Sequence, residues 1–208
     1  MTASEAGSLV RGERDRDLHR MLTFIDAAVA IALTLLVLPL VELTSEAGGA
    51  ESVSTLLREN QAELWSFLLS FAVIWQFWLG QHHALSTVVR PHPALSRLLL
   101  LWTLTIVFLP FPTALIGEAD EDTTTKLLYV GTLILSSLWV ALMNLLIRDR
   151  PEITDGGDRR DPRPAFVTVV LLVVALVIMV VLPATSYVPL LLLFLTGPVL
   201  TVATRLGL

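Results

Sequence analysis

The sequence predicts an all-α integral membrane protein with six transmembrane helices. Hydrophobic residues make up 54% of the 208 residues and charged residues only 16%, against about a quarter in ordinary soluble domains. The apolar residues come in runs of about 20, the length that a helix needs to cross a membrane. A soluble core of this size could not hide so much apolar surface, and the length leaves no room for a separate soluble enzyme.

Six segments are predicted to span the membrane. The first apolar run is longer than the core of a secretion signal, about 7–15 residues, so we expect it to be retained. The last two spans come from one apolar stretch that Pro183 and Pro189 interrupt, and a re-entrant hairpin is the alternative for the sixth. The predicted spans are residues 18–43, 63–86, 95–116, 125–147, 165–184 and 188–206, forming one membrane domain (18–208) after a cytoplasmic segment (1–17).

The charges support this topology. With both termini in the cytoplasm, only Arg58 and Lys126 of the 14 basic residues lie outside, as the excess of positive charge in cytoplasmic loops requires. Acidic residues crowd the outer loops instead. A five-span topology would place Arg205 outside, so the rule favours six spans.

The chain carries few groups for chemistry. It has no cysteine, which excludes disulfides and thiolate metal sites, and no phosphate-loop, dinucleotide or zinc-protease motif. His82 and His83 are adjacent, about 100° apart on a helix, so they cannot face one metal ion together. We therefore expect no enzyme, no metal or other cofactor and no nucleic-acid partner. The arginines at the cytoplasmic boundary are expected to contact lipid head groups.

Asp26 lies inside the first predicted span, where an ionised carboxylate is costly unless it is paired or wetted. The second span runs in the opposite direction, so His82 and His83 come near the same depth. A carboxylate–histidine contact between the two helices is therefore expected. It serves either as a structural clamp or as a proton sensor, because histidine titrates near neutrality.

The first span also carries two patterns of helical spacing. Ala28 and Ala32 form a small-xxx-small pair that lets helices approach closely. A second stripe is either ordinary packing or a pore wall, with apolar constrictions that exclude water and an acidic outer mouth that concentrates cations. Its members, at spacings of four, three, four and four, are Ala27, Ile31, Thr34, Leu38 and Glu42.

Three motifs carry a resemblance to a known family. The segment RMLTFIDAAVAIALTLLVLPL resembles the first helix of the transmembrane protein 175 family, with Arg20, Phe24 and Asp26 matching its motif and Ile25 replacing its serine. WLGQHHALS (78–86) is similar to the family's end of helix two, and FLPFPTAL (108–115) to its end of helix three. Leu99 and Pro39 replace polar residues that are common in the family, which weakens the polar network.

The resemblance implies a homotetrameric potassium channel in which the first helices surround a central pore. Hydrophobic constrictions would replace a carbonyl-lined filter, and the chain indeed has no such filter motif. Potassium and other monovalent cations are the implied permeant ions. Carried over by position, the pore residues are Ile31, Thr34 and Leu38, with Leu35 as a possible fourth, while a polar network braces the cytoplasmic end of the first helix: Arg20, Phe24, Asp26 and His82 or His83.

We therefore expect a potassium-permeable, weakly to moderately selective cation channel, resident in a bacterial plasma membrane. Three alternatives remain open at this point. They are a proton leak through the same pore, a small-solute transporter and a non-conducting membrane interaction protein.

Overall fold

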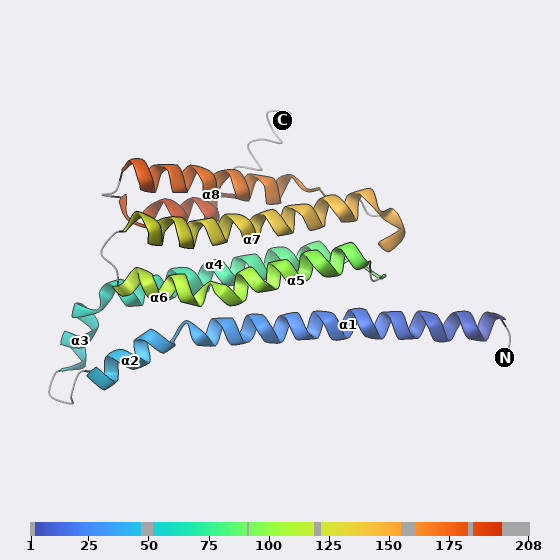
Figure 1. The fold of residues 1–208 in the computed structure, drawn as a ribbon, viewed down its shortest axis with the longest axis horizontal. Helices are drawn as coiled ribbons and strands as arrows, with labels where there is room; N and C mark the ends of the chain where they lie inside the picture. Colours follow the sequence, from blue (N-terminus) through green and yellow to red (C-terminus); the bar gives the residue numbers. More distant parts are fainter. Residues whose placement is uncertain are drawn as a thin grey trace.

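The computed structural model describes residues 3–46, 52–90, 92–118, 122–154, 161–182 and 185–196. In this part of the chain the regular elements are helices, which lie side by side in one bundle (Figure 1). They are α1 (Ala3–Leu35), α2 (Leu38–Glu46), α3 (Val53–Glu59), α4 (Gln61–Leu85), α5 (Pro93–Phe108), α6 (Pro110–Glu118), α7 (Thr123–Asp149), η1 (Pro151–Ile153), α8 (Arg163–Val181) and η3 (Val188–Leu195).

Five helical segments of the described chain are long and apolar enough to cross a membrane. Consecutive segments run in opposite directions along the bundle (Figure 1), as repeated crossing of a membrane requires. The prediction of an all-helical membrane protein is thereby confirmed for the described residues. The segments are Arg16–Leu43, Gln61–Leu85, Pro93–Ile116, Thr123–Asp149 and Arg163–Val181.

The sixth predicted span, residues 188–206, is not among these five. Its first part forms the 3₁₀ helix η3, which is 8 residues long and doubles back beside α7 and α8 (Figure 1). Residues 197–208 lie outside the described part of the chain. Six spans therefore stay a prediction.

Helix α7 forms the centre of the bundle and packs against α4, α5, α6 and α8. Its apolar side chains Leu133 and Met143 are completely buried. Two of its hydroxyls pair with hydroxyls of neighbouring helices, because a membrane offers them no water. Tyr129 Oη lies 2.9 Å from Ser70 Oγ of α4, and Ser136 Oγ donates to Thr105 Oγ1 of α5 at 2.7 Å.

Prolines bend two of the spans. Pro39 is the second residue of α2, directly after the break that follows α1, and Pro110 is the first residue of α6, directly after the break that follows α5. A proline within a helix has no N–H to donate, and its ring clashes with the carbonyl four residues earlier. At the first break the hydrogen bond spans three residues instead of four, because the N–H of Val37 donates to the carbonyl of Thr34 at 3.3 Å.

Helix α1 lies at one side of the bundle and packs mainly against α5, with further contacts to α4 and α6 (Figure 1). Only a narrow face of it is buried. Ala32 is 1% exposed, in agreement with a small residue where two helices come close. The other buried side chains of this face are Leu18, Ile25, Val29 and Leu36.

Candidate functional site

The candidate site is the uncovered face of α1. Ala27, Ile31 and Thr34 of the predicted stripe lie exposed on this face, and Leu38 and Glu42 continue the exposed stripe on α2. The large apolar side chains in it are far from buried, with exposed fractions of 58% for Ile31 and 51% for Leu38. Leu35, the possible fourth pore residue, is 44% exposed. The structure therefore brings all four predicted pore residues to a surface that the chain itself does not cover.

Thr34 is the polar member of the stripe at membrane depth, and its hydroxyl has a defined orientation. Its Oγ1 donates to the carbonyl of Ile31 at 2.7 Å. This bond uses the only proton of the hydroxyl and leaves the oxygen lone pairs for another partner. A hydroxyl held in this way can accept a hydrogen bond or contact a cation, but it cannot donate to an anion.

The N-terminal half of the span is tied to α4 through Trp78. The indole N–H of Trp78 donates to Asp26 Oδ1 at 2.8 Å. Among the described hydrogen bonds, Trp78 takes the place of the histidine that we expected beside Asp26. The ring of His82 stacks on Trp78 at 5.4 Å between centroids. Trp78 thus links Asp26 of α1 to His82 of α4, and the three side chains form one cluster.

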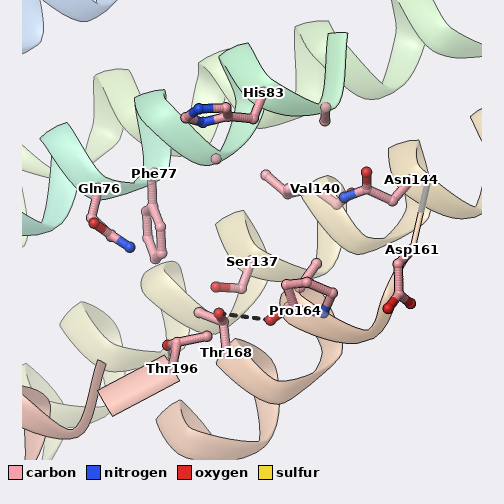
Figure 2. A pocket seen from close by; sticks show the side chains of 13 residues that line it. Gln76, Phe77, His83, Ser137, Val140, Asn144, Asp161, Pro164, Thr168 and Thr196 are labelled. Atoms are coloured by element: carbon pink, nitrogen blue, oxygen red, sulfur yellow. Dashed lines mark hydrogen bonds between the residues drawn. The ribbon is translucent and has the colours of Figure 1, made fainter. Parts of the chain in front are cut away.

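Of the other three residues of the predicted network, only His83 contacts this group, through an edge contact of its ring with that of His82 at 6.5 Å between centroids. The described hydrogen bonds, ion pairs and ring contacts do not join Arg20 or Phe24 to it, and Phe24 is 66% exposed. His83 Nδ1 instead lies 2.6 Å from the carbonyl of Leu79 in its own helix, and its ring borders a cavity on the other side of α4 (Figure 2).

Trp78 is the residue whose role was missed from the sequence, although it is part of the motif WLGQHHALS. The available signal was the indole N–H, which needs a hydrogen-bond partner when the ring lies inside a protein or membrane. The four-residue spacing to His82 also places both rings on one side of a helix.

Comparisons with known proteins point to one family. The sequence model of the family described as "Endosomal/lysosomal potassium channel TMEM175" matches residues 20–110, which include α4 and α5 and most of the candidate face. A potassium channel of Chamaesiphon minutus is 35% identical over 114 residues, 53% of this chain and 54% of that protein. A potassium channel of Streptomyces collinus is 30% identical over 144 residues, 69% of this chain and 68% of that protein. The match thus spans about half of the first relative.

Replacing Trp78 with phenylalanine is expected to weaken the attachment of α1 to α4. The substitution keeps an aromatic ring beside His82 but removes the donor to Asp26, at a cost of about 1 kcal/mol in the free energy of unfolding. The measurement is unfolding of the purified protein in mixed detergent micelles at increasing denaturing detergent.

Trp75→Phe is the matched control, because it shortens a neighbouring ring of the same cluster, 5.1 Å from Trp78 between centroids. Equal destabilisation by both variants would show that ring area, not the hydrogen bond to Asp26, holds the helices together.

Proposed function

Because this chain belongs to the TMEM175 family of potassium channels, we propose that it forms a potassium-permeable cation channel. The family is one of channels and not of enzymes. The observation in the molecule that carries the proposal is the uncovered stripe on α1, with Ile31, Thr34 and Leu38 exposed along one line.

A pore along this stripe needs several copies of the chain, because each chain contributes one α1. The buried face of α1 attaches the helix to α5 of its own subunit, while the opposite face is available to surround an axis. We place four subunits around that axis, the number that the resemblance implies. The closed assembly would cover the exposed side chains of Ile31, Leu35 and Leu38.

Each residue of the stripe then has a role in conduction. Ile31 and Leu38 form apolar rings that exclude water when they are close together, with Leu35 adding to the apolar wall. The lone pairs of Thr34 Oγ1, left over by its bond to the Ile31 carbonyl, replace part of the hydration of a potassium ion. One hydroxyl layer replaces few hydration oxygens, so the selectivity is modest. Glu42 adds negative charge at the outer mouth.

The orientation follows from the positions of the arginines. Arg20 lies on α1 before its apolar part, Arg97 in the first turns of α5 and Arg148 in the last turn of α7, so all three lie at the same end of the bundle. We assign this end to the cytoplasm, and with a sixth span both termini lie there. The two relatives are bacterial proteins, which supports a bacterial plasma membrane.

The experiment that tests the function is the reversal potential of purified protein in a planar bilayer, with potassium on one side and sodium on the other. We expect the current to reverse toward the potassium equilibrium potential. A pH-driven current without potassium would indicate a proton leak, and saturable, stoichiometric uptake a transporter. The absence of any flux from folded, tetrameric protein would leave the non-conducting alternative.

Thr34→Ala is expected to lower the preference for potassium over sodium, because it removes the hydroxyl from the pore wall. The permeability ratio should fall about two- to tenfold, the equivalent of about 0.5–1.5 kcal/mol for one polar contact. Thr103→Ala is the control, since the hydroxyl of Thr103 also donates to a carbonyl of its own helix, at 2.8 Å, but lies buried on α5. Equal ratios in wild type and Thr34→Ala would remove Thr34 from the pore.

Ile31→Asn is expected to increase conductance or open probability, because an amide wets the constriction that isoleucine keeps dry. Ile31→Val is the matched control, since it keeps an apolar ring of similar shape. Single-channel recordings of both variants decide the matter. Wild-type conductance and gating in Ile31→Asn would exclude Ile31 as a gate.

A further inference from the structure

A cavity of about 390 Å³ lies between α4, α7 and α8, with a contribution from Thr196 after η3. This volume is within the usual range for small-molecule sites, about 300–1,000 Å³. None of its lining residues comes from α1, so the cavity is separate from the proposed pore. Figure 2 shows its side chains converging from the three helices.

Ser137 indicates that the cavity holds a ligand. Its side chain is 3% exposed, and its hydroxyl has no hydrogen-bond partner among the described residues. A buried hydroxyl without a partner is costly. Ser136, the preceding residue, shows the ordinary solution, since it donates to Thr105 at 2.7 Å. Ser137 instead lies among the side chains that line the cavity (Figure 2).

Three polar side chains of the cavity donate a proton to the backbone and keep lone pairs free, while Gln76 and Ser137 can both donate and accept. Thr168 Oγ1 donates to the carbonyl of Pro164 at 3.0 Å, and Thr196 Oγ1 donates to that of Leu193 at 2.7 Å. The side-chain nitrogen of Asn144 donates to the carbonyl of Val140 at 3.0 Å, which leaves its oxygen as an acceptor. These three groups thus direct protons to the protein's own backbone.

Two titratable side chains extend this pattern. His83 Nδ1 lies 2.6 Å from the carbonyl of Leu79, which only accepts, so the other nitrogen of a neutral ring is an acceptor. Asp161 adds negative charge. Its Oδ1 accepts the backbone N–H of Arg163 at 3.0 Å and lies 3.9 Å from Arg163 Nε, and a carboxylate has further lone pairs beyond these contacts. The lone pairs of these side chains, together with the part of the Asp161 carboxylate that Arg163 does not contact, suit a ligand that donates hydrogen bonds and carries positive charge.

The remaining wall is apolar and includes Phe77, Val140 and Ala165. We propose that this cavity binds a small amphipathic ammonium compound, whose charged group contacts Asp161 and Asn144 and whose apolar body packs on Phe77. A bare inorganic cation would leave most of the volume and the apolar wall unused. Because α4, α7 and α8 all line the site, the ligand would hold these helices together independently of conduction.

The first test is equilibrium binding of para-fluorophenethylammonium to the full-length chain in lipid nanodiscs, followed by fluorine NMR. We expect a saturable component for this cation that para-fluorophenylpropionate lacks. Asp161→Asn should weaken it about two- to fivefold, as for one partly exposed ion pair. Purely non-saturable partitioning, equal binding of the anion or wild-type affinity in Asp161→Asn would each overturn the proposal.

The second test uses the absence of cysteine from the chain. Ser137→Cys introduces a single thiol in the cavity, and phenethylammonium is expected to slow its alkylation by N-ethylmaleimide saturably. Thr124→Cys is the control, an exposed position on the same helix outside the cavity lining, and should show no such protection. Equal alkylation rates of Ser137→Cys with and without phenethylammonium, or equal protection of the thiols in both variants, would contradict the assignment.

Discussion

The structure depends on one constraint, that polar groups at membrane depth must find their partners inside the protein. Helices satisfy the backbone within each segment, which is why the five spans in the described chain are helical. The same constraint governs the side chains. Hydroxyls of α7 bond to hydroxyls of α4 and α5, and the carboxylate of Asp26 receives an indole N–H. Each of these bonds fixes one helix against another.

The prolines are local exceptions to this constraint, and one of them lies within the candidate face. The helix is interrupted between Leu35 and Leu38, directly before Pro39. The stripe was therefore predicted with the spacing of a continuous helix, although the helix is interrupted within it. Thr34, Leu35 and Leu38 are nevertheless all exposed. The bend turns α2 without returning Leu38 to the protein interior.

The sequence was sufficient for the five spans found in the described chain, because hydropathy and length measure the cost of placing a segment in a membrane directly. It was sufficient for the family, because three short motifs kept their order and spacing. It was not sufficient for contacts between helices. Which residue of α4 meets Asp26 depends on the rotation of two helices, and a change of one residue turns a side chain by about 100°. The sequence therefore suggested His82 or His83, where the structure has Trp78. The cavity beside Ser137 was missed for the same reason.

Exposure alone does not separate a pore wall from a surface that faces lipid, since both are apolar. The contrast between the exposed faces of α1 and α8 distinguishes the two kinds of surface. The exposed residues of α8 that lie beyond its first turn are valines, among them Val170, Val174 and Val177, and such a face suits hydrocarbon. The exposed stripe instead includes the hydroxyl of Thr34 on α1 and, at its far end on α2, the carboxylate of Glu42. Polar groups on a spanning helix generally face the protein interior or a water-filled path. A line that carries both, on a helix whose other face is already packed, is therefore better matched to an aqueous axis shared between subunits than to lipid.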